Sequence, residues 1–245
     1  MKRYPINKIN ISVTNLDKTL DFLKDSVKNG KTGYVCVTNA RTSYLANQDA
    51  DYCAIQNNSL LTVPDGMPLV WIANNNGFNE VGKVSGKDLM DALFTISVKE
   101  GYSHYFYGCS QKTIDLIQQK LLVKYPGLDI KAAISPPFQP IEAYDIEGLA
   151  KNVNDLNPTF FWCGLGAPKQ ERVMALLQPH LNSTISIGIG LAFEYFAGTV
   201  KRAPKFMQKN GLEWLYRIYK QPERVSYRSL KALFSILNPL IKSKL

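Results

Sequence analysis

The chain has 245 residues, of which 45% are apolar and 20% are charged. That length fits one large domain or one domain with an appendage, and the composition excludes a disordered, collagen-like or coiled-coil chain. The whole net charge of +9 lies in residues 200–245, which hold eleven Lys or Arg residues against two Glu. A neutral body therefore precedes a basic C-terminal segment, unlike the even distribution of a uniformly basic nucleic-acid-binding protein.

Cysteine and histidine usage predicts a reduced, cytosolic protein without a zinc site. The four cysteines are far apart, none forms a C-x-x-C pair, and each lies in or beside an apolar stretch. They are Cys36, Cys53, Cys109 and Cys163. The two histidines, His104 and His180, have no partner at metal-ligand spacing. The first ten residues lack the apolar core of a signal peptide, and we expect no transmembrane span.

Short apolar runs alternate with helical patterns from residue 9 to residue 190. Strands are predicted at residues 9–13, 34–37, 60–63, 104–107, 128–133, 159–163 and 184–189. Helices are predicted at residues 15–29, 67–76, 86–100, 110–124, 142–155 and 168–178. Strands that are apolar on both faces and alternate with helices predict an α/β fold, with a largely parallel sheet flanked by helices.

Polar and glycine-rich residues follow these strands, at the edge of the sheet where α/β proteins bind ligands. The site is therefore predicted to contain Thr38-Asn39, Asp65-Gly66, Gly108, residues 164–170 and the segment after Gly190.

The C-terminal segment has a different pattern. Strands stop near Phe196, and helices are predicted at 204–220, 222–237 and 239–244. In the second of these, Arg224, Arg228 and Lys231 share one stripe, while Leu and Phe side chains lie largely on another face. We divide the chain into a core of residues 1–198 and a basic amphipathic helical appendage of residues 199–245. A basic amphipathic segment favours an anionic membrane surface; ordinary packing and nucleic-acid binding through interleaved aromatic residues are the alternatives.

Asp65 is the sharpest candidate for a catalytic residue. It follows an apolar strand and precedes Gly66, so its carboxylate is expected at the edge of the sheet. The alternative is that Asp65 caps the following helix. Thr38 and Asn39 end a strand in the same way, and they could either cap a helix or present a hydroxyl and an amide to a sugar or phosphate.

Two further patterns have a structural and a functional reading. Residues 164–171 form a strand–turn–helix junction whose backbone N–H groups could hold a phosphate, although Lys169 replaces the third glycine of a dinucleotide-binding loop and a tight turn is the alternative. Asp49 and Asp51 form a D-x-D pattern at the expected start of a helix, where acidic residues are favourable, so we assign no metal to them.

Seven motifs together resemble one family, although each alone is unspecific. In chain order they are Val37-Thr38-Asn39-Ala40, Pro64-Asp65-Gly66-Met67-Pro68, Ser85-Gly86-Lys87-Asp88-Leu89-Met90, Gly164-Leu165-Gly166-Ala167-Pro168-Lys169-Gln170-Glu171, Phe193-Glu194-Tyr195-Phe196-Ala197-Gly198, Arg202-Ala203-Pro204 and Gly211-Leu212-Glu213-Trp214. Over about residues 5–230 the chain resembles the WecG/TagA/CpsF glycosyltransferases of bacterial surface-polysaccharide synthesis.

The resemblance implies an inverting glycosyltransferase with a Rossmann-like core. The donor would be a UDP-sugar carrying a hexose or N-acetylhexosamine, with N-acetylmannosamine or its uronic acid favoured. The acceptor would be a sugar on polyprenyl diphosphate, usually undecaprenyl diphosphate, at the cytoplasmic face of the membrane. It also implies a peripheral protein whose C-terminal appendage completes the site and meets the membrane, and a reaction that needs no metal or other cofactor. The sequence leaves a homo-oligomer open.

The resemblance also implies roles for individual residues. Asp65 would be the general base, and Thr38 would join it as a catalytic residue. Substrate contacts would come from Asn39, Lys83, Gly166, Gln170, Arg217, Arg224 and Arg228, the three arginines reaching the diphosphate. Two positions depart from the family pattern: Lys83 stands where many members have Arg, which loses the planar guanidinium fork, and Glu194 stands where Asp is common.

Two other classes of function remain as alternatives. The first is a UDP-sugar-binding module on the same fold that no longer catalyses a reaction, and the second is a nucleic-acid-binding protein that uses the basic tail. The match of Asp65, Thr38 and Gln170 to the family motifs favours the enzyme, and the continuous apolar face of the tail disfavours nucleic acid.

Overall fold

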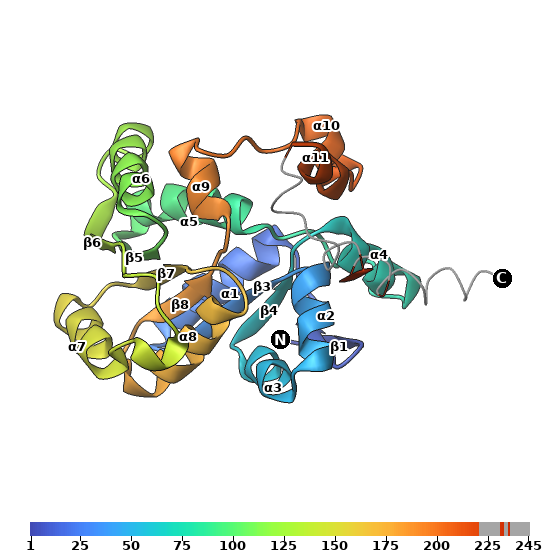
Figure 1. The fold of residues 1–245 in the computed structure, drawn as a ribbon, viewed down its shortest axis with the longest axis horizontal. Coiled ribbons are helices and arrows are strands. Elements are labelled where there is room, and N and C mark those ends of the chain that lie inside the picture. Colours follow the sequence, from blue (N-terminus) through green and yellow to red (C-terminus); the bar gives the residue numbers. More distant parts are fainter. Residues whose placement is uncertain (221–230, 233–234, 236–245) are drawn as a thin grey trace.

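The structure is a computed structural model that describes residues 1–220, 231–232 and 235 (Figure 1). The predicted helix at 239–244 and most of the one at 222–237, with Arg224 and Arg228, lie outside the described residues. Within the part of the chain that is described, no helix is long and apolar enough to cross a membrane.

A six-stranded parallel sheet forms the centre of the molecule, as the apolar runs predict. The strand order is β4-β3-β8-β7-β5-β6. The bounds are β3 (Gly33–Thr38), β4 (Leu61–Pro64), β5 (Ser103–Gly108), β6 (Asp129–Ile134), β7 (Phe160–Gly164) and β8 (Ile185–Gly188). Thr38 pairs with Pro64, and Gly108 pairs with Gly164, so the carboxyl ends of these strands are level. The polar residues that follow them therefore meet at one edge.

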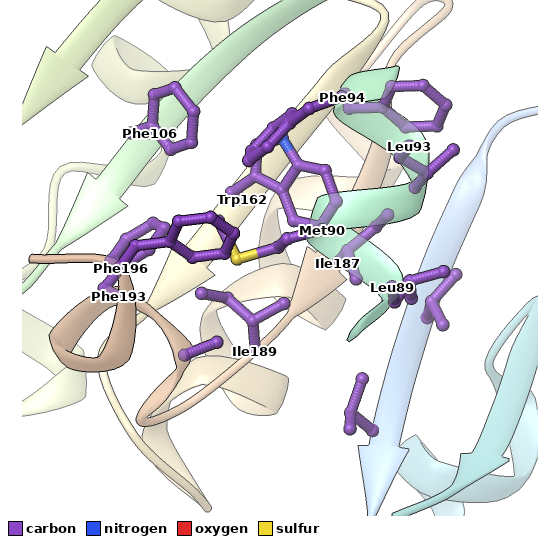
Figure 2. Close-up of a cluster of buried hydrophobic side chains, with 14 of the residues drawn as sticks. Leu89, Met90, Leu93, Phe94, Phe106, Trp162, Ile187, Ile189, Phe193 and Phe196 are labelled. Carbon is purple, nitrogen blue, oxygen red and sulfur yellow. The ribbon is translucent and has the colours of Figure 1, made fainter. Parts of the chain in front are cut away.

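Helices cover both faces of the sheet because alternate strand residues point to opposite sides. One face packs against α1 (Leu16–Lys28), α5 (Gly86–Glu100), α6 (Gln111–Lys124) and α9 (Ala192–Ala197). Its centre is an aromatic cluster in which Phe94 lies edge-on to Phe106 and Trp162 (Figure 2). The other face packs against α3 (Ala50–Asn58), α7 (Ile146–Leu156) and α8 (Lys169–Leu177).

The N-terminal region differs from the sequence-based prediction. The strand predicted at 9–13 is β2 (Ile9–Ser12), which pairs with β1 (Arg3–Ile6) as an antiparallel hairpin outside the main sheet. The hairpin shares a small apolar core with α2 (Ala40–Gln48), α3 and α4 (Met67–Asn75). Two single-turn 3-10 helices are η1 (Ile141–Ala143), which precedes α7, and η2 (Gln178–His180), which follows α8. Because η1 occupies residues 141–143, α7 starts later than predicted.

The prediction of a single helix at 204–220 is wrong, because the structure has two helices there, α10 (Lys205–Lys209) and α11 (Glu213–Lys220). The helical conformation is interrupted at Gly211, whose φ of +72° is in the left-handed region. A Cβ atom there would lie 2.8 Å from Cζ2 of Trp71 and 2.9 Å from Cβ of Met67, both on α4. A residue without a side chain is therefore required where α10–α11 packs on α4.

Candidate active site

A cavity of about 390 Å³ lies at the carboxyl ends of β3, β4 and β8. Strand-end residues, including Asn39, Asp65 and Gly190, line it from the core. Residues of the C-terminal segment line it as well: Arg202, Gln208, Gly211, Glu213, Trp214, Arg217 and Ile218. The predicted edge of the sheet and residues 202–218 thus line one cavity.

Asp65 lies in this cavity directly after β4. Its backbone N–H donates a hydrogen bond of 2.6 Å to the carbonyl oxygen of Thr38. The helix cap of α4 is Gly66, and no side chain caps that helix, so the alternative that Asp65 is an N-cap is wrong. The carboxylate is therefore not committed to the helix and is available to the cavity.

The surroundings of Asp65 make its carboxylate a stronger base than usual. Burial and the negative charge of Glu213 raise its pKa to about 6, against the opposing charges of Lys83, Arg217 and Arg202. A carboxylate with this pKa is mostly ionised at pH 7 yet holds a proton more tightly than an ordinary aspartate. These are the properties that a general base needs near neutral pH.

Asn39 lines the cavity, but its side-chain oxygen caps α2, which confirms the cap reading. That oxygen accepts hydrogen bonds from the N–H groups of Arg41 at 3.0 Å and Thr42 at 3.2 Å, and the Thr42 hydroxyl accepts one from the Asn39 N–H at 2.8 Å. Three backbone N–H groups at the start of α2 thereby have acceptors, and two of these bonds form a capping box between Asn39 and Thr42.

The hydroxyl of Thr38 is not brought to the cavity. Thr38 is fully buried, and its Oγ1 donates a hydrogen bond of 2.6 Å to Oε1 of Gln56. Nε2 of Gln56 donates in turn to the Tyr52 hydroxyl at 2.8 Å. Thr38 thus contacts Asp65 through its carbonyl oxygen, and its side chain holds β3 against α3.

Gln170 connects two glycine turns at the edge of the sheet. Its Oε1 accepts hydrogen bonds from the N–H groups of Gly166 at 3.1 Å and Gly190 at 3.0 Å, while its Nε2 donates to Oε1 of Glu171 at 2.8 Å. Gly166 has a φ of +81°. Both residues line the cavity, but the side chain of Gln170 and the Gly166 N–H bond to protein groups.

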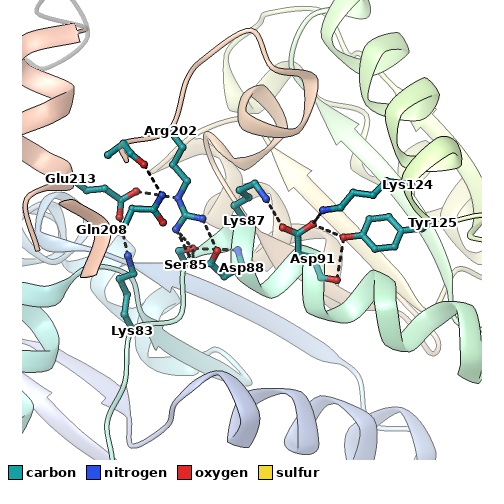
Figure 3. Close-up of polar contacts among 11 residues, drawn as sticks. Lys83, Ser85, Lys87, Asp88, Asp91, Lys124, Tyr125, Arg202, Gln208 and Glu213 are labelled. Carbon is teal, nitrogen blue, oxygen red and sulfur yellow. Dashed lines mark hydrogen bonds and ion pairs between the residues drawn. The ribbon is translucent and has the colours of Figure 1, made fainter. Parts of the chain in front are cut away.

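Arg202 and Glu213 are site residues to which the sequence assigned no role. Arg202 binds both oxygens of Asp88, at 2.5 and 2.8 Å, and the Ser85 hydroxyl at 3.0 Å (Figure 3). Its Nε also donates to Oε1 of Glu213 at 3.2 Å, and Lys83 binds the other oxygen of Glu213 at 2.9 Å. The only sequence signal was their presence in the Arg202-Ala203-Pro204 and Gly211-Leu212-Glu213-Trp214 motifs.

Arg202 also fixes the charge of its partner in this cluster. Burial alone would raise the pKa of Asp88, but the hydrogen bonds from Arg202 and Ser85 lower it to about 2. The Asp88 carboxylate is therefore ionised throughout the neutral range, and it anchors the start of the C-terminal segment to α5.

Arg217, on α11, lines the cavity, and its buried Nε has no hydrogen-bond partner among the described residues. Lys83 also lines the cavity, but its ammonium group is paired with Glu213. The two remaining predicted arginines, Arg224 and Arg228, lie outside the described residues. Of the predicted substrate-binding cations that the structure describes, Arg217 is thus the one whose placement fits an additional anionic group in the cavity.

A second cavity of about 340 Å³ lies at the carboxyl ends of β5, β6 and β7. Its lining residues include Ser110, Ser135, Phe138, Tyr144 and Lys169. Phe138 is 97% exposed, and the Lys169 ammonium lies 4.2 Å from the centre of its ring. The turn between β7 and α8 contributes residues to both cavities.

His104 and Asp49 both have partners within the fold. His104 is buried among aromatic rings and accepts a hydrogen bond of 2.9 Å from Trp162, and burial lowers its pKa to about 3. Asp49 caps α3 by accepting a hydrogen bond from the Tyr52 N–H at 2.9 Å, which confirms the helix start. Over residues 1–220, 231–232 and 235, no three or more His, Cys, Asp or Glu side chains gather as a metal site.

Comparison with known proteins identifies a family and curated relatives that include two mannosaminyltransferases. The model of the glycosyl transferase WecG/TagA/CpsF family matches residues 4–245. An N-acetylglucosaminyldiphosphoundecaprenol N-acetyl-beta-D-mannosaminyltransferase of Bacillus subtilis (strain 168) is 28% identical over 225 residues, which cover 91% of this chain and 86% of the relative. A protein of the same name from Bacillus spizizenii is 25% identical over 225 residues, which again cover 91% of this chain and 86% of the relative.

Proposed function

The chain belongs to the WecG/TagA/CpsF family of glycosyltransferases, and from this premise we propose that it transfers an N-acetylhexosamine or hexose from a UDP-sugar to a sugar on polyprenyl diphosphate. The relatives, named as N-acetylmannosaminyl transferases that act on N-acetylglucosaminyl diphosphoundecaprenol, favour an N-acetylmannosamine-type donor and that acceptor class. The product would enter the synthesis of a surface polysaccharide.

The observation that carries the proposal is Asp65 in a cavity rimmed by cations. Transfer to a hydroxyl needs a base for the acceptor proton and positive charge for the departing diphosphate. The pKa of about 6 makes Asp65 suited to the first task. Arg217, with an Nε that none of the described side chains satisfies, suits the second, because a guanidinium forms charge-assisted hydrogen bonds with phosphate oxygens.

We propose a single displacement with inversion at the anomeric carbon. Asp65 takes the proton from the acceptor hydroxyl, and the oxygen of that hydroxyl forms a bond to C1 of the donor sugar. The bond between C1 and the phosphate oxygen breaks on the opposite face, and UDP leaves with the electron pair. The charge that develops on the leaving diphosphate is stabilised by Arg217, together with Arg224 and Arg228 from the appendage.

The second cavity is our candidate for the nucleoside half of the donor. The turn between β7 and α8 contributes residues to both cavities, and an exposed aromatic ring, Phe138, offers a face on which a base can stack. We expect Phe138→Ala to weaken UDP binding about 10-fold, in the lower part of the range for loss of one stacking contact. Isothermal titration with UDP measures this directly, and an unchanged affinity would assign the nucleoside elsewhere.

Membrane contact by residues 199–245, on the cytoplasmic side, is the second part of the proposal. In the described part of this segment Phe206 is 70% exposed and Tyr219 is 78% exposed, next to the basic residues Lys205 and Lys220. Exposed apolar groups beside cations suit an anionic lipid surface. The double variant Phe206→Ser/Tyr219→Ser should float less well with anionic liposomes than the parent chain, whereas Val123→Ser, at an 83% exposed position on α6, should not. Equal flotation of all three would contradict this contact.

A donor screen tests the enzymatic proposal. The purified protein is incubated with a lipid-linked N-acetylglucosaminyl diphosphate and, in turn, with UDP-N-acetylmannosamine, UDP-N-acetylglucosamine and UDP-glucose. Release of UDP that depends on the acceptor is expected with one of these donors. Binding of UDP without turnover of any donor would favour the non-catalytic binding module.

A further inference from the structure

Glu213 is one of the residues through which α11 contacts the rest of the fold. It is the first residue of the helix, and its two carboxylate oxygens have different partners: Lys83 before α5 and Arg202 after α9. Arg202 is in turn held by Asp88 and Ser85 at the start of α5 (Figure 3). Two segments distant in the sequence, residues 83–88 and 202–213, therefore meet at one carboxylate.

The same carboxylate faces the proposed base. Glu213 and Asp65 both line the main cavity, and the charge of Glu213 opposes ionisation of Asp65. The other charged groups that act on Asp65 are Lys83, Arg202 and Arg217, which favour ionisation. The Tyr195 hydroxyl, on α9, belongs to the same cluster, because the charges of Asp65 and Glu213 both act on it.

We propose that Glu213 is a positioning residue for the transfer reaction: clamped between Lys83 and Arg202, its carboxylate holds α11 over the cavity and keeps a negative charge facing Asp65. The inference rests on the proposed function for the role of Asp65. It assigns Glu213 two effects. It places Arg217, one helical turn further along α11, at the cavity, and it neutralises the two cations that would otherwise bind Asp65 and weaken it as a base.

This arrangement explains why three cations can lie near a base without removing its basicity. A carboxylate beside unpaired cations has a lowered pKa and gives up its affinity for a proton. Lys83 forms an ion pair with Glu213, and Arg202 forms ion pairs with Glu213 and Asp88. The positive charges of Lys83 and Arg202 are therefore balanced by carboxylates other than Asp65. Arg217 then remains for the substrate, and Asp65 remains basic.

The test compares Glu213→Gln, which removes the charge, with Glu213→Asp, which keeps it, and with the control Glu80→Gln. Glu80 forms an exposed ion pair with Lys18 outside the cavity. Two measurements are made on the full chain: the pH dependence of kcat/KM with the donor and acceptor found in the screen, and the 13C NMR titration of the Asp65 carboxyl, assigned with Asp65→Asn.

In Glu213→Gln we expect the acidic limb of the profile and the NMR midpoint of Asp65 to move to lower pH together, by about 0.5–1 unit. We also expect kcat/KM at pH 7 to fall about 10-fold as Arg217 loses its fixed position. Glu213→Asp should keep the parent midpoint, and Glu80→Gln should change neither quantity.

An NMR midpoint that stays the same in Glu213→Gln would overturn the proposal, even if turnover falls, because a merely structural role of Glu213 would produce that result. Absence of turnover in the parent chain would instead count against the proposed function. The NMR titration, which needs no turnover, would then still decide whether Glu213 acts on Asp65.

Discussion

The backbone N–H of Asp65 donates a hydrogen bond of 2.6 Å to the carbonyl oxygen of Thr38. This bond extends the pairing of β3 and β4 by one step beyond the register pair Thr38 and Pro64. It fixes the backbone of Asp65 at the edge of the sheet, while Gly66 rather than Asp65 begins the next helix. The sheet therefore sets the position of the proposed base, and the Asp65 carboxylate does not cap α4.

The protein should become more stable when Asp65 is replaced by Asn. Since folding raises the pKa of Asp65 from 3.8 to about 6, the stability associated with its protonated form is present below pH 4 and is lost as the pH rises through 6. One pKa unit corresponds to about 1.4 kcal/mol, and partial exposure of the side chain lowers the effect. We therefore expect Asp65→Asn to raise the free energy of unfolding at pH 8 by about 1–2 kcal/mol.

Urea denaturation at pH 8 and pH 4 measures this difference. The free energy of unfolding of Asp65→Asn should exceed that of the parent clearly at pH 8 and hardly at all at pH 4, where the parent Asp65 is already protonated. A loss of stability at pH 8 would mean that the ionised carboxylate is stabilised in the fold, contrary to a raised pKa.

Thr38→Val separates a catalytic hydroxyl from a structural one. Valine has nearly the same shape but removes the donor to Gln56, which leaves a buried amide oxygen without this partner. Such a loss costs about 1–3 kcal/mol of stability. If the hydroxyl serves only the contact between β3 and α3, Thr38→Val should unfold earlier while keeping turnover within about 10-fold of the parent. A stable Thr38→Val variant with turnover as low as that of Asp65→Asn would support the catalytic role predicted from the family motif.

Gly211→Ala should weaken the docking of α10–α11 on α4. The substitution adds strain at a φ of +72° and places a methyl group against Trp71 and Met67. Gly101→Ala is a matched control, because its φ is +70° but a Cβ atom there meets nothing within 4 Å. We expect Gly101→Ala to lower stability by about 1 kcal/mol through strain alone. Gly211→Ala should also raise the KM for the donor, because α11 carries Arg217.

Kinetics and thermal unfolding of the two glycine variants distinguish these effects. Equal losses of stability and an unchanged KM in both variants would show that the contact between Gly211 and α4 does not support the site.

Much of the fold could be predicted because the strands of a parallel sheet are apolar on both faces. The run at 9–13 was the exception, since a strand of a separate hairpin and a strand of the main sheet have similar short apolar patterns. Its partner Arg3–Ile6 contains a proline and a charged residue, which hides it as a strand. Helices α2 and α3 were not predicted as a pair. Their amphipathic patterns are weak, and side-chain caps at Asn39 and Asp49 mark their starts.

The candidate site could be predicted where it depends on the ends of strands, as Asp65 does. Its other half depends on contacts between distant segments. Arg202 lies 114 residues from Asp88, and Lys83 lies 130 residues from Glu213. No local pattern specifies such pairs. The break at Gly211 has the same origin, because the helical periodicity of 204–220 carries no information about Trp71.

The central claim is that Asp65 takes the proton from the acceptor hydroxyl. The most direct measurement is acceptor-dependent UDP release by Asp65→Asn and by the parent chain at pH 7, with UDP affinity measured on both proteins by isothermal titration. If Asp65 is the base, Asp65→Asn should lose at least about 100-fold in turnover, in line with the loss of a general base, and should bind UDP with nearly the parent affinity. Turnover within a few-fold of the parent would contradict it.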